Sequence, residues 1–148
     1  MMRAIALLAL LAVTAAADAV VVNIGNPWVP SAGPGGTSAA YMDIRSDVDL
    51  KLVGATSPWA DKIEIRAVER KSGAPVEHAV TELEVPANVQ VRLAPGGNYL
   101  ALSAIKRGFT NGDYVPVTLR FEDAKRIPHT VDVNVQARGM TVPTRKVE

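Results

Sequence analysis

Residues 115–121 read Val-Pro-Val-Thr-Leu-Arg-Phe, so that bulky apolar side chains occupy every second position of the segment. A period of two gives a strand one apolar and one polar face, which is typical of a strand half-buried in a sheet. The same alternation recurs in residues 63–66, 89–93 and 131–136. These four segments predict strands that contribute one face each to a common core.

Outward from these segments, the chain alternates short strand-like stretches with turn-forming residues. Further candidate strands are residues 20–24, 38–45, 50–55, 79–85 and 99–105, and turns are expected at residues 25–27, 33–36, 71–73, 95–97 and 110–113, which are rich in Gly, Pro and Asn. No long window shows the apolar spacing of a helix after the amino-terminal run. Eight or nine short strands predict an all-β fold, an antiparallel sandwich or barrel.

The amino terminus has the pattern of a secretory signal over residues 1–19. Arg3 precedes an apolar run over residues 4–13, and Ala17-Asp18-Ala19 matches a signal-peptidase cleavage pattern. A membrane anchor is the alternative, but the run is shorter than the about 20 residues that a spanning helix needs. We therefore expect a cleaved signal, a periplasmic or secreted domain over residues 20–137 without a membrane span, and a flexible tail over residues 138–148.

The composition excludes several classes of function. The 148 residues include 16 basic and 15 acidic side chains, two histidines and no cysteine. Without cysteine there is no disulfide, thiolate zinc site, iron–sulfur cluster or cysteine-linked lipid anchor. The balanced charge gives no basic stripe for nucleic acid. No serine has the surroundings of a catalytic nucleophile, so we expect no enzyme.

Five segments occur in an order that carries a family resemblance. They are residues 26–30 (NPWVP), 39–45 (AAYMDIR), 52–66 (LVGATSPWADKIEIR), 83–97 (LEVPA followed by VRLAPGG) and 112–122 (GDYVPVTLRFE). Together they resemble the PCuAC family of periplasmic copper chaperones. The resemblance implies a cupredoxin-like Greek-key β-sandwich in the bacterial cell envelope.

The family's copper motif, His-x10-Met-x21-His-x-Met, keeps its spacing in this chain but not its residues. The four positions are occupied by Arg66, Glu77, Tyr99 and Ala101. Cu(I) is a soft ion that prefers imidazole and thioether ligands, and none of these four residues offers either. Arg66 also stays protonated and only donates hydrogen bonds. The resemblance therefore implies a copper-chaperone-like domain without its metal site, and we expect no bound cofactor.

Other histidine and methionine residues offer little replacement. His78 follows Glu77 directly, and neighbouring side chains of a regular strand point to opposite faces. Only an irregular loop after Pro75 would turn His78 inward as a substitute ligand. Met42 is expected in the core, and beyond His129 the chain end offers Met140 and no histidine.

Arg66, Glu77 and Tyr99 allow two interpretations. The sequence favours drift after a lost function, with the three side chains exposed and unpaired. The alternative is an Arg66–Glu77 ion pair capped by the Tyr99 hydroxyl, which would hold the same segments together in place of the metal.

Two functional hypotheses remain open from the sequence. In the first, the protein takes part in envelope copper handling, with an envelope copper protein or another periplasmic protein as partner. In the second, the sandwich is a metal-free periplasmic module that binds a protein or a small ligand.

Overall fold

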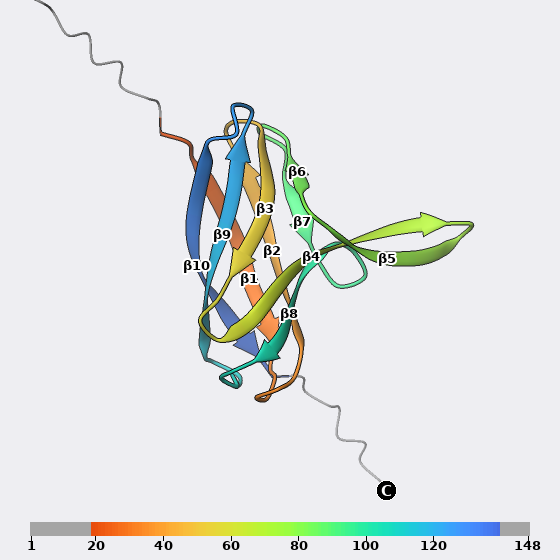
Figure 1. The fold of residues 1–148 in the computed structure, drawn as a ribbon, viewed down its shortest axis with the longest axis vertical. Coiled ribbons are helices and arrows are strands. Elements are labelled where there is room, and N and C mark those ends of the chain that lie inside the picture. The colour runs from red at the N-terminus through yellow and green to blue at the C-terminus, as the bar shows by residue number, and fades with distance from the viewer. Residues whose placement is uncertain (1–18, 140–148) are drawn as a thin grey trace, which may run out of the picture.

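The computed structural model describes residues 19–139, which form ten strands and no helix (Figure 1). The predicted all-β class is thus confirmed. The strands are β1 (Val22–Pro30), β2 (Ser38–Ser46), β3 (Leu50–Thr56), β4 (Ala60–Lys71), β5 (Ala74–Val80), β6 (Leu83–Val85), β7 (Val91–Leu93), β8 (Tyr99–Ile105), β9 (Tyr114–Asp123) and β10 (Pro128–Arg138).

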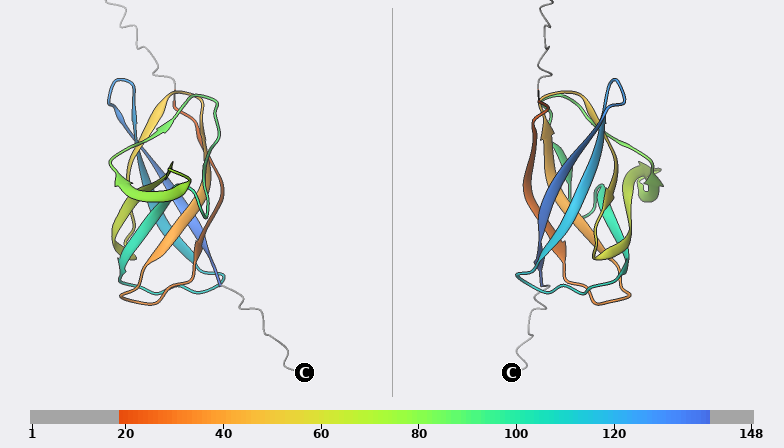
Figure 2. Two further views of the ribbon diagram at one scale, coloured as in Figure 1. Left: turned by 90° about the vertical axis from the view of Figure 1, so that its right-hand side faces the viewer. Right: turned by 60° about the vertical axis from the view of Figure 1, so that its left-hand side comes forward.

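The strands follow the order β5-β4-β8-β2-β1-β10-β9-β3-β6, and β7 pairs with β2. Figure 2 shows them wrapped around one interior, with β9 and β10 on the side opposite β4 and β8. Strands distant in sequence are neighbours, β8 beside β2 and β9 beside β3, as in a Greek-key sandwich. All pairs are antiparallel except β1 and β10, whose parallel register matches Trp28 with Gln136.

The predicted alternation in residues 115–121 builds the core. Val115, Val117, Leu119 and Phe121 are each at most 2% exposed. They pack in one cluster with buried side chains of the other strands, including Met42, which is 2% exposed and belongs to the core as expected. Within residues 19–139, the buried core residues lie between Val29 and Ala137.

Three local predictions are wrong. The turn expected at residues 25–27 is a β-bulge inside β1, where the register with β2 shifts and Asn26 takes a φ of 45°. The strand expected at residues 79–85 is divided between β5, which pairs with β4, and β6, which pairs with β3. Of residues 89–93 only Val91–Leu93 form a strand, because Val89 belongs to a turn closed by its N–H to the Pro86 carbonyl.

The most prominent departure from a simple sandwich is the hairpin of β4 and β5, which projects from the body (Figure 1). Beyond Val68 its side chains are exposed on both faces, from Glu69 to Glu77. A segment without a buried face has no period-two signal, so the length of the hairpin could not be predicted from alternation.

Within residues 19–139, no helix is long and apolar enough to span a membrane. The expected signal lies outside the described residues except for Ala19. The expected tail begins within β10 at Arg138, and the part from residue 140 onward lies outside them.

His129 has a structural partner at the turn between β9 and β10. Its Nε2 lies 3.0 Å from Asp123 Oδ2, and Asp123 Oδ1 accepts hydrogen bonds from the backbone N–H groups of Lys125 and Ile127. The His129 hydrogen bond is the main cause that holds the pKa of Asp123 below its ordinary value. His129 therefore helps to close the turn between β9 and β10.

Replacement of Phe121 by alanine tests the assignment of the core. Phe121 is fully buried, and removal of such a ring costs about 3–5 kcal/mol of unfolding free energy. Urea unfolding followed by tryptophan fluorescence measures the loss. Tyr114→Ala is the matched control on the same strand, because Tyr114 is 58% exposed and its loss is expected to cost no more than about 0.5 kcal/mol. Equal costs for the two variants would contradict the assignment.

Candidate functional site at the base of the β4–β5 hairpin

The pairing of β4 with β8 places the candidate residues on the outer face of the sheet. Arg66 is the register partner of Tyr99, and Glu64 is the partner of Ala101. Leu100 and Leu102 alternate with them along β8 and point into the core. Because side chains alternate across a strand, Tyr99 and Ala101 point outward with Arg66 and Glu64.

Arg66, Glu77 and Tyr99 are in contact and join three strands. Arg66 Nε lies 3.4 Å from Glu77 Oε1, and the Tyr99 hydroxyl donates a hydrogen bond to the same carboxylate oxygen. A second carboxylate, Glu64 Oε2, lies 3.9 Å from an Arg66 terminal nitrogen. We call these four residues the Arg66 cluster. The expectation that Arg66, Glu77 and Tyr99 are unpaired is therefore wrong, and the ion pair with its tyrosine cap is present.

The Arg66 cluster lies where the hairpin leaves the body. β5 pairs only with β4, and a two-stranded hairpin without further support is marginally stable in water. Glu77 on β5 reaches Arg66 on β4 and Tyr99 on β8. Asn98 adds a second tie, because its Oδ1 accepts a 3.0 Å hydrogen bond from the N–H of Val68, just beyond the last β4–β8 pair. These polar contacts support the hairpin from the body.

Sequence reasoning missed Asn98 and a row of aromatic rings that continues the cluster across the sheet. The Tyr99 ring lies 6.3 Å from that of Tyr41 on β2, which lies 4.8 Å from that of Trp28 on β1. Each ring precedes or follows a buried residue of its own strand. The period-two alternation could therefore have shown that all three rings lie on the outer face. The Arg138 guanidinium ends the row, 5.4 Å from the Trp28 ring.

The environment fixes the protonation states of the two polar partners of Glu77. The pKa of Tyr99 is raised, first by its hydrogen bond to Glu77 and second by burial. The pKa of Arg66 is raised mainly by its hydrogen bond to Tyr99. Near neutral pH the cluster therefore holds a charged guanidinium and a protonated phenol.

Ala101 and His78 lie apart from these contacts. Ala101 is the partner of Ala39 on β2 and lines an outer-face hollow beside Tyr99. His78 is in a regular part of β5 opposite Ala67, so its side chain leaves the face opposite to that of Glu77. Its Nε2 is 4.0 Å from Glu69 Oε1.

The residues at these positions do not fit a Cu(I) ion. A guanidinium cannot donate an electron pair, a protonated phenol is a poor ligand, a carboxylate is hard and a methyl group is inert. Within residues 19–139, no three His, Cys, Asp or Glu side chains converge in a way that could hold a metal ion. The Arg66 cluster can instead hold strands together by charge-assisted hydrogen bonds.

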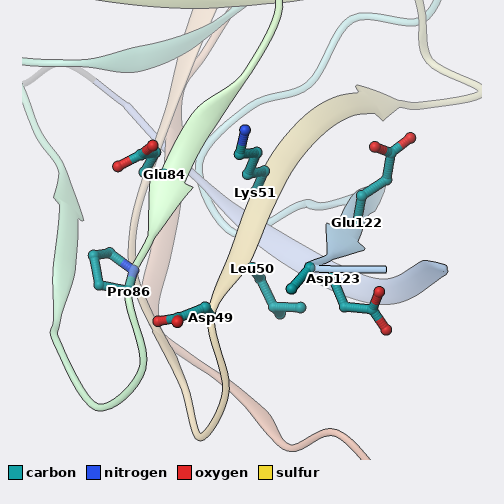
Figure 3. Close-up of a pocket in the computed structure, with 8 residues that line it drawn as sticks. Asp49, Leu50, Lys51, Glu84, Pro86, Glu122 and Asp123 are labelled. Carbon is teal, nitrogen blue, oxygen red and sulfur yellow. The ribbon is translucent and has the colours of Figure 1, made fainter. Parts of the chain in front are cut away.

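A second hollow, of about 310 Å³, lies over β3, β6 and β9 (Figure 3). Lys51 lies between Glu84 and Glu122, its partners on the neighbouring strands, and its Nζ pairs with Glu82 at 3.1 Å. None of these strands contributes to the Arg66 cluster, so the two places are separate.

The tyrosine titration tests the Glu77 contact. The hydrogen bond to Glu77 is the main cause of the raised pKa of Tyr99, whereas for Tyr41 burial is the main cause and the Glu77 charge the second. Glu77→Gln is therefore expected to let both phenols ionise at lower pH than in the unchanged protein. A raised phenol pKa adds stability below the unfolded value of 10.0, which is lost as the pH rises through the folded pKa. The variant should lose the part of this alkaline dependence that Glu77 causes and keep the part that burial causes.

Tyrosine ring-carbon signals in NMR measure both phenols separately. Glu69→Gln is the matched control, because Glu69 lies on the same hairpin and its carboxylate faces His78. Tyrosine titrations that are the same in Glu77→Gln and in the unchanged protein would contradict the contact.

Solved structures share the fold. The apo form of DR1885 from Deinococcus radiodurans, determined in solution, has a TM-score of 0.60 and 27% identity over 94% of this chain and 93% of that one. A copper-bound PCuAC domain from PmoF2 has a TM-score of 0.59 and 23% identity over 78% of this chain and 92% of that one. The apo PCuAC domain from PmoF1 also has a TM-score of 0.59 and 23% identity, over 78% of this chain and 93% of that one. These similarities confirm the cupredoxin-like fold.

The sequence comparisons give the family. The family model described as "Putative lipoprotein LpqE-like" matches residues 22–135. A relative from Leifsonia xyli subsp. xyli, "Putative lipoprotein Lxx21020", is 34% identical over 115 residues, which cover 76% of this chain and 69% of the relative. The family match and the similar structures together confirm the resemblance to PCuAC domains. The chain belongs to the LpqE-like family, with a domain of the PCuAC type.

Proposed function

We propose that this protein is an exported copper-chaperone-like domain, related to envelope copper handling, that does not bind Cu(I) at the family's position. The observation that carries the proposal is the Arg66–Glu77–Tyr99 contact, in which a fixed guanidinium occupies the first ligand position and binds the residue at the second. The domain acts through contacts with another envelope protein rather than through a metal ion of its own.

Electrostatics opposes a metal at this place. A guanidinium about 4 Å from a monovalent cation costs about 4 kcal/mol at an effective dielectric of about 20, or about three decades of affinity. Arg66 would avoid this cost by swinging away, but it would then leave Glu77 and Glu64. The paired side chains of Arg66, Glu64 and Glu77 are each a third or more exposed, so these pairs contribute little to the stability of the fold. The proposal that Cu(I) does not bind here therefore rests on the lack of suitable ligands and on the charge of Arg66, not on the strength of the ion pairs.

The Arg66 cluster gives the hairpin a metal-independent support. In this proposal the guanidinium provides the positive charge that holds β4, β5 and β8 together. The surface that these strands present to a partner is therefore formed before the partner binds. An envelope copper protein is the partner that the family relationship favours.

Export is supported by the amino-terminal sequence and by the names of relatives. Residues 1–19 have the signal pattern, and the Leifsonia relative and the family model are both described as lipoproteins. This chain holds no cysteine, the residue that carries the lipid in such proteins. We propose a cleaved signal and a periplasmic or secreted domain.

The second candidate is a metal-free module that binds a protein or a small ligand on the outer face. The aromatic row and the hollow beside Tyr99 favour it, because both provide contact surface next to the Arg66 cluster. A copper-accepting partner that fails to bind the domain would favour this second candidate over the first.

An anaerobic Cu(I) competition titration tests the proposal. The domain without residues 1–19 is expected to show no stoichiometric Cu(I) binding tighter than micromolar. The variant Arg66→His, Glu77→Met, Tyr99→His, Ala101→Met restores the family's four ligand types on the existing strands. It should bind one Cu(I) at least about a thousandfold more tightly than the unchanged domain.

Two controls sharpen the titration. Arg66→Ala removes the charge without adding a ligand and is expected to leave Cu(I) affinity weak. His78→Ala tests the substitute ligand and should change nothing. Tight stoichiometric binding by the unchanged domain would refute the proposal, and loss of that binding in His78→Ala would identify the ligand responsible.

A further inference from the structure

A hollow of about 560 Å³ lies on the outer face over the ends of β1 and β2 and across β8 and β4. The left view of Figure 2 shows β2, β8 and β4 side by side on this part of the molecule. The volume is within the range of about 300–1,000 Å³ that small-ligand sites occupy. We call it the hydroxyl hollow; its lining is Pro30, Ser31, Thr37, Ser38, Ala39, Glu64, Arg66, Tyr99, Ala101, Leu102 and Ser103.

Hydroxyl groups dominate the polar lining. Ser31, Thr37 and Ser103 contribute side chains that both donate and accept hydrogen bonds. The Ser38 hydroxyl donates to the Pro30 carbonyl at 2.8 Å, which leaves its oxygen free to accept. Such a lining suits a ligand whose own groups both donate and accept.

The charged groups beside the hollow balance one another. Arg66 faces Glu64 and Glu77, and Lys62 pairs with Glu64, so two positive and two negative charges are present. An ionic ligand would have to break a pair that already exists. A neutral hydroxyl can donate to Glu64 and accept from Arg66 while the pairs persist. The electrostatics therefore selects neutral polar groups over ions.

The floor of the hollow is small and apolar. Ala39 and Ala101 are directly opposite each other on β2 and β8, and the Tyr99 ring follows beside Ala101 on the same face. This surface can accept the C–H face of a ring while the rim binds its edge. Sugar rings have this combination of an apolar face and a hydroxylated edge.

We propose that the hydroxyl hollow binds a neutral saccharide unit, as part of a glycan that the exported domain meets. The inference rests on the proposed function in one respect: Arg66 and Ala101 leave this place to a ligand other than copper. An open surface hollow and neutral hydrogen bonds fit weak binding, in the millimolar range for a single short saccharide. The sugar is positioned by Glu64, Arg66 and Tyr99. The small side chains of Ala39 and Ala101 leave room for its ring.

Backbone NMR of the isotope-labelled domain tests the inference. The probes are neutral trisaccharides of glucose, mannose and N-acetylglucosamine, with trigalacturonic acid as the charged comparison. At least one neutral probe should shift the signals of residues in the hydroxyl hollow, and the acidic probe should shift them less. No saturable change at millimolar concentrations of any neutral probe, or a stronger response to the acidic one, would overturn the proposal.

Ala101→Leu places a larger apolar side chain on the floor and should weaken the saturable response at least about tenfold. Ala124→Leu is the matched control, because Ala124 is exposed on the turn between β9 and β10. A response that persists in Ala101→Leu would overturn the assignment to this hollow. The Cu(I) titration of the same samples separates the two proposals, because sugar binding and copper binding have independent readouts.

Discussion

The register between β4 and β8 is the constraint on which the candidate site depends. Ile65 and Leu100 are register partners and are both buried. A slip of one residue would turn these apolar side chains outward and bring charged ones into the core, so burial strongly specifies the pairing. With that register set, Arg66 must lie opposite Tyr99 on the outer face. The core thus determines the geometry of a polar cluster that itself contributes little to stability.

In the proposed account, the family's metal-ligand positions keep their geometry while their chemistry changes. A bound ion would draw ligands from separate strands toward one point, and Arg66 does the same with carboxylates and a phenol. Because the guanidinium is covalently attached, this support of the hairpin is independent of copper supply. The outer face beside it carries aromatic rings and hydroxyl groups. The proposed metal-free domain therefore still has a surface that can bind a partner or a ligand.

The sequence predicted the parts of the fold that bury one face. The alternation in residues 115–121 and 131–136 corresponds to β9 and β10, and the spacing from Arg66 to Tyr99 singled out residues that the structure brings together. The sequence could not predict that Glu77 pairs with Arg66, because contact depends on the projecting β5, whose exposed residues carry no periodic signal. The bulge at Asn26 was also hidden, because Gly-Asn-Pro is equally typical of a turn.

The most direct test of the central claim is the hydrogen exchange of the Val68 amide, which donates to Asn98 where the hairpin leaves the body. The exchange rate is measured with excess Cu(I) and with a Cu(I) chelator, in the unchanged domain and in Arg66→Ala. If the Arg66 cluster replaces the metal, the amide is equally protected in both conditions and exchanges faster in Arg66→Ala. Protection that rises when Cu(I) is added to the unchanged domain would contradict the account.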